Sequence, residues 1–161
     1  QGVSSAASDV YKRQTYCCLL RPHQEIRLLK WKDFSADLKT IHLGGNKVKS
    51  KRNRLVPVPS YVRDLLVRSE SDDNIFSNKI KPYNNDYFKT LFRRFKQLNP
   101  KIDKGVTLYS FRHSAALNIF NRTGSLTKLQ KAMGHSSLKV SLTYLRGLEV
   151  AELTEEDMPQ V

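Results

Sequence analysis

The sequence predicts a mainly α-helical domain with one small antiparallel β-sheet, an α+β fold. Three observations lead to this prediction. Apolar residues recur at helical spacing through the second half of the chain. Two short segments rich in β-forming residues flank a glycine turn at 44–46. The 161 residues suffice for one domain with its own core. They contain no apolar run of ~20 residues, so we expect no membrane-spanning segment.

The first half of the chain holds the predicted sheet. Residues 1–14 are small and polar, show little periodicity and lack an initiator Met, so we expect a non-native or disordered leader there. Pro22 lies where a short helix can begin, because a first turn does not need its missing N–H. Segments 39–43 and 54–59 are the expected strands, and the prolines of the second mark a sheet edge. A helix over 60–68 follows, with a serine as its expected cap.

The second half is predicted to be helical. The clearest amphipathic helix ends before Pro100, and its apolar face repeats at i, i+3, i+4 and i+7: Phe88, Leu91, Phe92, Phe95 and Leu98. Ser110 is the expected cap of the next helix, which Gly124 closes. A further helix over 126–133 follows, and we expect 136–145 to be helical as well.

The charge of the chain indicates a polyanionic partner. The 28 Lys and Arg against 15 Asp and Glu give a net charge of +13. Five of the acids and none of the bases lie in an acidic C-terminal tail, 147–161, so residues 1–146 carry 28 bases, ten acids and a net +18. A field of this sign favours nucleic acid or an anionic membrane surface. Basicity alone does not separate these two kinds of partner.

The cysteines and the missing ligand motifs exclude several classes of protein. Cys17 and Cys18 are adjacent within an apolar run, so we expect free thiols in a reducing compartment. No Cys or His pair elsewhere completes the spacing of a metal site. The sequence also has no Gly-rich phosphate loop and no carboxylate cluster for Mg²⁺. We therefore expect no metal and no nucleotide cofactor.

Four residues suited to phosphodiester chemistry follow one another along the chain. Arg21 and Arg112 lie among apolar residues at predicted helix starts, and His135 precedes Tyr144 by nine positions. Guanidinium groups are planar, permanently charged and able to bind two phosphate oxygens at once. A phenol can attack the phosphorus. For either arginine taken alone, a structural salt bridge is the alternative, for instance Arg21 with Glu25.

This order of residues, together with the segment Met133-Gly134-His135-Ser136, resembles the catalytic domain of the tyrosine recombinase (phage integrase) family. The resemblance covers residues 15–146 and implies an integrase-like catalytic domain. Two helices precede the first arginine in that family, whereas only residues 15–20 convincingly do so here. We therefore expect the domain to be truncated at its N-terminus.

The resemblance also implies a function. Members of the family cleave and rejoin DNA through a 3′-phosphotyrosyl intermediate, which makes double-stranded DNA the expected partner. It implies no cofactor and a homotetramer on DNA, formed through the tail 147–161. The expected location is the cytoplasm, at the nucleoid, in a prokaryotic or phage context.

Each candidate residue receives a role from the resemblance. Arg21 and Arg112 would bind the scissile phosphate, His135 would hydrogen-bond to it, and Tyr144 would be the nucleophile. Glu25 would orient the first arginine. The family's hairpin lysine, placed by the segment Arg54-Leu55-Val56-Pro57, corresponds to Lys49 and would protonate the leaving 5′ oxygen. Neighbouring Lys47 and Lys51 are close enough to be confused with it.

The sequence departs from the family at Tyr109, where many relatives have the histidine of His-x-x-Arg. A tyrosine hydroxyl can hydrogen-bond to phosphate but is no base near neutral pH. Two alternatives stay open. One is a type IB topoisomerase-like enzyme, and the other is a catalytically degenerate DNA-binding module, which Tyr109 favours. Further basic residues are expected to contact the DNA backbone: Lys47, Lys51, Arg52, Arg93 and Arg94.

Overall fold

The computed structural model describes residues 2–47, 53–146 and 156. The fold is mainly α with one two-stranded antiparallel sheet, as the sequence predicted. In chain order, the elements are helix α1 (Gly2–Cys17), 3-10 helices η1 (Ile26–Leu28) and η2 (Trp31–Asp33), strands β1 (Thr40–Leu43) and β2 (Arg54–Pro57), helices α2 (Ser60–Arg63), α3 (Tyr87–Leu98), α4 (Leu108–Thr123), α5 (Leu126–Met133) and α6 (Leu138–Leu142), and 3-10 helix η3 (Thr143–Leu145).

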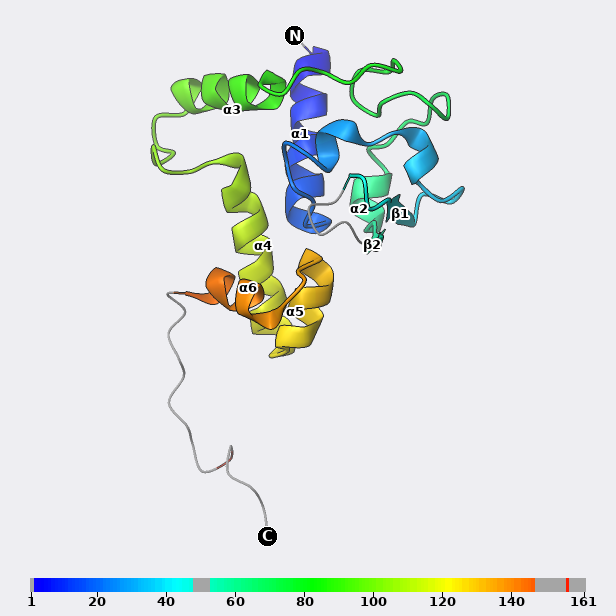
Figure 1. The fold of residues 1–161 in the computed structure, drawn as a ribbon. Helices are drawn as coiled ribbons and strands as arrows, with labels where there is room; N and C mark the ends of the chain where they lie inside the picture. The colour runs from blue at the N-terminus through cyan, green and yellow to red at the C-terminus, as the bar shows by residue number, and fades with distance from the viewer. Residues whose placement is uncertain (1, 48–52, 147–155, 157–161) are drawn as a thin grey trace.

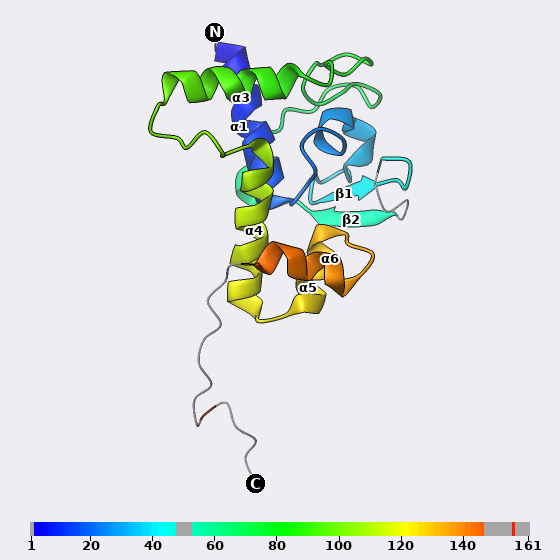
Figure 2. The same cartoon turned by 60° about the vertical axis from the view of Figure 1, so that its left-hand side comes forward.

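Helix α1 packs on α4, and α4 connects the upper part of the molecule with α5 and α6. In Figure 1, α1 runs down the upper half, α3 lies beside the upper part of α1, and α4 descends to α5 and α6. Figure 2 shows β1 and β2 side by side, with β2 facing the group formed by α5 and α6. Hydrogen bonds from Arg54 to Met133 and Leu19 link these parts. The end of α1, the start of β2 and the end of α5 therefore meet in one place.

The sheet buries one of its faces. Strand β1 pairs with β2 so that Ile41 lies opposite Val56 and Leu43 opposite Arg54. Because side chains alternate along a strand, Arg54 lies on the same face as buried Val56, while Leu55 between them is exposed. The side chain of Arg54 therefore points toward the interior of the protein.

Two apolar clusters form the core. The larger one packs η1, η2, the sheet, α2 and α3 against α1, around Trp31 and Leu20. The smaller one lies where α4 meets α5, and its buried members are Leu19, Ala115, Ala116, Leu129 and Met133. Cys18 belongs to the larger cluster as a free thiol, and burial raises its pKa to about 12. Within the described residues, no helix is long and apolar enough to cross a membrane.

The structure does not agree with a disordered leader over 1–14, because Gly2–Cys17 form helix α1. Tyr11 is 1% exposed and stacks on Phe88, with 3.7 Å between the ring centroids. Gln14 is buried as well. The packed domain therefore begins before residue 15. A single aromatic residue among small polar ones gave too weak a periodic signal to predict this. That these residues are non-native stays a prediction.

Two helices near the sheet are shorter than predicted. The helix expected from Pro22 is present only as the 3-10 helix η1, Ile26–Leu28. A turn precedes it, in which the Glu25 side chain accepts a hydrogen bond from the backbone N–H of Arg21. Helix α2 ends at Arg63 instead of residue 68. Beyond it, Leu65 and Val67 are exposed, and Leu66 alone of these three packs against the core.

The helices of the second half lie close to their predicted positions. Helix α3 buries Phe88 and Phe92, and α5 ends at Gly134 with a left-handed φ of 65°. Helix α4 begins earlier than expected. Its cap is Thr107, and Ser110, the predicted cap, is instead the third helical residue, whose hydroxyl accepts from the Thr107 backbone N–H at 3.0 Å. The two residues form a capping box, which explains the helical start at 108.

Candidate active site

A buried carboxylate fixes the first arginine. Glu25 is fully buried and accepts hydrogen bonds from the Arg21 backbone N–H at 2.8 Å and from Arg21 Nη1 at 2.5 Å. The Arg21 side chain keeps 13% of its surface exposed. The salt bridge considered from the sequence is therefore present, and it leaves part of the guanidinium open to a ligand.

The second arginine lies inside the protein. Arg112 on α4 is 0% exposed, and its Nη2 donates to the Met133 carbonyl at 2.6 Å. Its Nε and Nη1 have no hydrogen-bond partner among the described residues. Burial lowers its pKa, although Glu25 and Tyr144 oppose this. A buried cation with free donors is costly unless an anion approaches it. Arg112 is therefore prepared for an anionic ligand.

A turn after α5 presents the histidine and the tyrosine together. Gly134 closes α5, and His135 follows with Nδ1 3.0 Å from the buried Ser141 hydroxyl. Short helix α6 and η3 then return the chain, so that the rings of His135 and Tyr144 lie 5.1 Å apart. Tyr144 also stacks on His113, with 5.6 Å between the ring centroids. The ring of His113 therefore supports the position of Tyr144.

Four of the described residues that were predicted to be catalytic line one hollow of about 750 Å³, which we call the active-site hollow. Arg112 does not line it, but is buried and donates to the carbonyl of Met133, the residue before Gly134. Tyr109 lines the hollow with a side chain that is partly exposed. The lining residues are Arg21, Gln24, Tyr109, Gly134, His135, Ser136, Val140 and Tyr144. Three segments that lie far apart in the sequence thus meet at one surface, and they carry Arg21, Tyr109, and His135 with Tyr144.

Arg54, at the start of β2, also lies beside Glu25 and Met133, although the sequence did not predict a function for it. Its Nη1 donates to the Met133 carbonyl at 2.9 Å, and its Nη2 lies 3.4 Å from Glu25. The available signal was the alternation of the strand, which places Arg54 inward with Val56. In the sequence, Arg54 served only as part of the segment that places the hairpin lysine, Lys49.

Positive charge dominates the site. The guanidiniums of Arg21, Arg54 and Arg112 share one carboxylate, Glu25. Burial, followed by these three arginines, lowers the pKa of His135 to about 4. His135 is therefore neutral near pH 7 and acts as a hydrogen-bonding group. Burial likewise lowers the pKa of Arg54 to about 10.

The hairpin residues can be placed only in part. Lys49, Lys51 and Arg52 lie outside the described residues. Lys47 is described, and its ammonium forms an ion pair with Asp33 of η2. This pair ties Lys47 to the neighbouring 3-10 helix. Within the described residues, no group of three or more His, Cys, Asp or Glu side chains could hold a metal ion.

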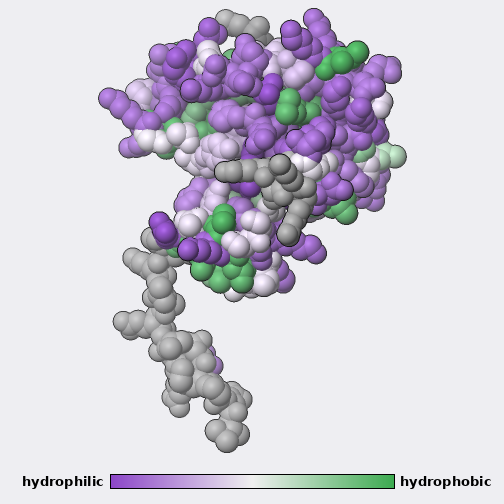
Figure 3. All heavy atoms as spheres, in the orientation of Figure 1, coloured by the Kyte–Doolittle hydropathy of each residue, from purple (hydrophilic) through white to green (hydrophobic). Residues whose placement is uncertain are grey.

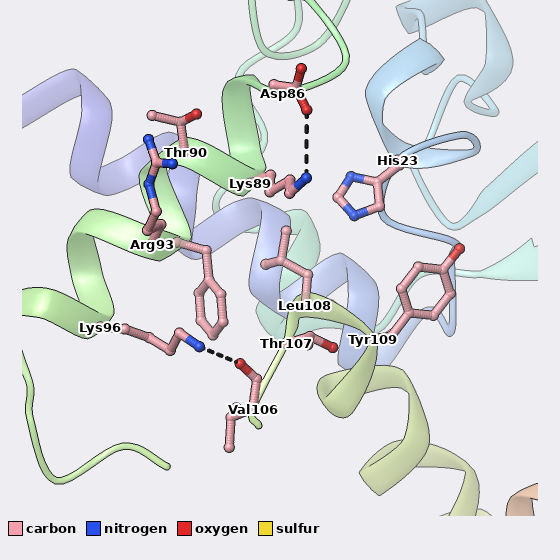
Figure 4. Close-up of a pocket in the computed structure, with 11 residues that line it drawn as sticks. His23, Asp86, Lys89, Thr90, Arg93, Lys96, Val106, Thr107, Leu108 and Tyr109 are labelled. Atoms are coloured by element: carbon pink, nitrogen blue, oxygen red, sulfur yellow. Dashed lines mark hydrogen bonds and ion pairs between the residues drawn. The ribbon is translucent and has the colours of Figure 1, made fainter. Parts of the chain in front are cut away.

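A second hollow, of about 680 Å³, lies between α3 and α4 and adjoins the active-site hollow through Tyr109. Figure 4 shows Lys89 directed toward His23, with Arg93 further along α3. Arg93 lines this α3–α4 hollow, whereas Arg94 is exposed outside its lining. Of the two candidate DNA-backbone residues on α3, Arg93 is therefore the one next to the site.

Fold and site together define a helical domain that gathers arginines, a neutral histidine and a tyrosine at one basic hollow. A family model described as the phage integrase family matches residues 9–149, and the chain belongs to that family. The family predicted from the sequence is thus confirmed.

Two curated relatives are similar over part of their length. Tyrosine recombinase XerD of Halalkalibacterium halodurans is 27% identical over 66% of this chain and 41% of the relative. Tyrosine recombinase XerA of Thermococcus kodakarensis is 26% identical over 83% of this chain and 52% of the relative. The chain thus spans about half the length of these relatives.

Solved structures share the fold. The XerH site-specific recombinase bound to difH substrate, in a pre-cleavage complex, matches 97% of this chain and 46% of that chain, with a TM-score of 0.69 and 18% identity. The catalytic domain of bacteriophage HP1 integrase matches 89% of this chain and 80% of that chain, with a TM-score of 0.64 and 19% identity. The second match shows that the fold is similar to that of the HP1 integrase catalytic domain.

Proposed function

We propose that this chain is the catalytic part of a site-specific DNA recombinase that cleaves and rejoins DNA through a 3′-phosphotyrosyl intermediate. The observation that carries the proposal is the buried Arg112. Two of its donor nitrogens have no hydrogen-bond partner among the described residues, and its third donates to Met133, next to Gly134 in the hollow that Arg21, His135 and Tyr144 also line. A phosphodiester in this hollow would supply the missing anion. The Tn1549 transposon integrase, a structural neighbour solved in complex with a circular intermediate DNA, supports DNA as the ligand.

The proposed reaction begins with attack by Tyr144. Its oxygen forms a bond to phosphorus, and the bond from phosphorus to the 5′ oxygen breaks. The phenol releases its proton to solvent, the 5′ oxygen takes one from Lys49, and the Lys49 amine regains one from solvent, so the net proton count is unchanged. Because a tyrosine pKa is near 10, the phenol needs help at neutral pH. Guanidiniums placed at developing negative charge provide it, and one such donor contributes about 10²–10³ in rate.

His135 and Tyr109 would assist without transferring protons. Because His135 is neutral, one of its nitrogens can donate to a phosphate oxygen while the other is held by Ser141. Tyr109 lines the same hollow and would donate its hydroxyl. A tyrosine therefore suits a donor position that does not require a base.

Oligomerisation belongs to the same proposal. Figure 3 shows a largely hydrophilic face with small apolar areas, and α6 exposes three apolar side chains: Leu138, Val140 and Leu142. They offer contact surface to a neighbouring protomer in a homotetramer on DNA. The tail 147–161 lies almost wholly outside the described residues, and its part in this contact is proposed from the family resemblance. We propose a cytoplasmic location at the nucleoid.

A nicked suicide substrate tests the enzyme proposal. Its cleavage releases a short strand and leaves a protein–DNA adduct that can be seen on a denaturing gel. A catalytically degenerate binding module gives no adduct. A topoisomerase-like enzyme also forms one, but relaxes supercoiled DNA without joining two sites; the recombinase names of the curated relatives do not favour this alternative.

A further inference from the structure

Arg54 joins three chain segments at the site. Its Nη1 donates to the carbonyl of Met133, at the end of α5, at 2.9 Å. Its Nη2 lies 3.4 Å from the carbonyl of Leu19, just before Arg21, and 3.4 Å from Glu25 Oε2. The side chain is 8% exposed. One guanidinium therefore touches the segments that carry Arg21 and His135.

Gly134 provides the space that Arg54 occupies. A Cβ added at Gly134 would lie 2.5 Å from Arg54 Nη1 and 2.7 Å from its Cδ, closer than atoms can approach. Gly134 also has a φ of +65°, a conformation that favours glycine. Two features therefore favour glycine at position 134: the left-handed backbone of the turn and the close contact with Arg54.

The contacts of Arg54 have a direct link to Arg112. Both guanidiniums donate to the same acceptor, the Met133 carbonyl, Arg112 at 2.6 Å and Arg54 at 2.9 Å. This carbonyl immediately precedes Gly134 and His135 in the chain. A change in Arg54 would therefore move the acceptor that orients Arg112 and the start of the turn that presents His135. The planar fork of arginine serves several acceptors at once, which an ammonium group cannot reproduce.

We propose that Arg54 is a positioning residue, which fixes the Leu19–Arg21 corner and the Met133–His135 turn relative to each other and thereby aligns Arg112 and His135. This inference rests on the proposed function for its effect on cleavage. Its geometric part concerns the chain without DNA and is tested separately.

The geometric test uses two glycine variants. Gly124 has a φ of +58° and no atom within 4 Å of an added Cβ, so Gly124→Ala introduces backbone strain without a clash. Gly134→Ala introduces the same strain together with the clash against Arg54. In NMR spectra of the DNA-free chain, Gly134→Ala should shift the amide signals of Leu20 and Arg21, which precede it by more than 110 residues. Gly124→Ala should leave them unchanged.

Arg54→Lys provides the second geometric arm, with Arg122→Lys as the matched exposed control. Arg54→Lys keeps the charge and should shift both the Leu20–Arg21 signals and the His135 ring signals. If a folded Arg54→Lys chain keeps all of these signals in place, Arg54 positions neither segment. If it does not fold, Gly134→Ala decides, and unchanged Leu20–Arg21 signals in that variant overturn the inference.

The activity arm separates positioning from direct DNA contact. Arg54→Lys should slow adduct formation at saturating DNA on the order of 10²-fold, the usual effect of a misplacement of about 1 Å, and should change the DNA dissociation constant less than about 3-fold. Added to Arg112→Lys, it should cost little more, because both act through the Met133 carbonyl. If the rate losses of Arg54→Lys and Arg112→Lys are fully additive in the double variant, the two residues do not act through the same carbonyl. A wild-type chain without any adduct would refute the proposed function, and the NMR arms would then decide the inference alone.

Discussion

The two sides of the active-site hollow are held in different ways. On the arginine side, Glu25 and backbone carbonyls fix Arg21, Arg54 and Arg112 through charge-assisted hydrogen bonds. On the tyrosine side, Tyr144 lies on a short 3-10 helix and packs against the rings of His113 and His135. The two sides therefore differ in the interactions that hold them. Hydrogen bonds fix the arginines before any ligand binds, whereas ring packing holds Tyr144.

The largest expected effect concerns a residue that neither side supplies, the leaving-group acid. Lys49→Ala should slow cleavage by about 10²–10⁴, the usual contribution of general acid catalysis. A substrate with a bridging sulfur at the 5′ position should restore most of the rate, because a thiolate leaves without a proton. The measurement is single-turnover cleavage of both substrates. Equal defects on the two substrates would remove Lys49 from this function, and Lys47→Ala is the matched control.

Glu25→Gln tests the arginine side through stability. The substitution leaves three guanidiniums around a neutral side chain, and breaking a buried ion pair costs about 3–5 kcal/mol. We expect a loss of this size in the free energy of unfolding, measured with urea. Asp72→Asn, which breaks an exposed pair with Lys32, should cost much less, because solvent screens that pair. Similar losses for both variants would contradict the claim that Glu25 holds the arginine side together.

Arg112→Lys tests the same side through chemistry. Lysine keeps the charge but loses the planar fork, so we expect a reduction of about 10²–10³ in cleavage with little change in DNA binding. Cleavage rate and DNA affinity should be measured on the same suicide substrate. Near-normal cleavage by this variant would exclude Arg112 from the phosphate site.

The smallest expected effect is on the pH dependence of stability. The pKa of His135 is lowered from 6.5 to about 4 in the folded chain, so below pH 6.5 the unfolded chain binds a proton that the folded chain does not. The contribution of His135 to stability should therefore be complete above pH 6.5 and decline as the pH falls toward 4. His135→Gln should flatten the unfolding free energy over this window. The pKa of His23 is lowered as well, and its share of the slope should remain.

The sequence predicted those parts of the molecule that have a strong local signal. The apolar spacing of α3 and the glycines after α4 and α5 located three helices, and the family motifs located Arg21, Arg112, His135 and Tyr144. Helix α1 was missed because its buried contacts depend on Tyr11, which packs on Phe88 from a distant segment. Arg54 was missed because its partners, Glu25 and Met133, are brought to it only by the fold.

The central claim is that Tyr144 attacks the phosphate bound by the arginine side. Incubation of a nicked suicide substrate with the chain tests this most directly. The claim predicts a covalent adduct that peptide mapping places on Tyr144, and a Tyr144→Phe variant that binds DNA normally without forming any adduct. An adduct formed by the phenylalanine variant, or a linkage mapped to Tyr109, would contradict it.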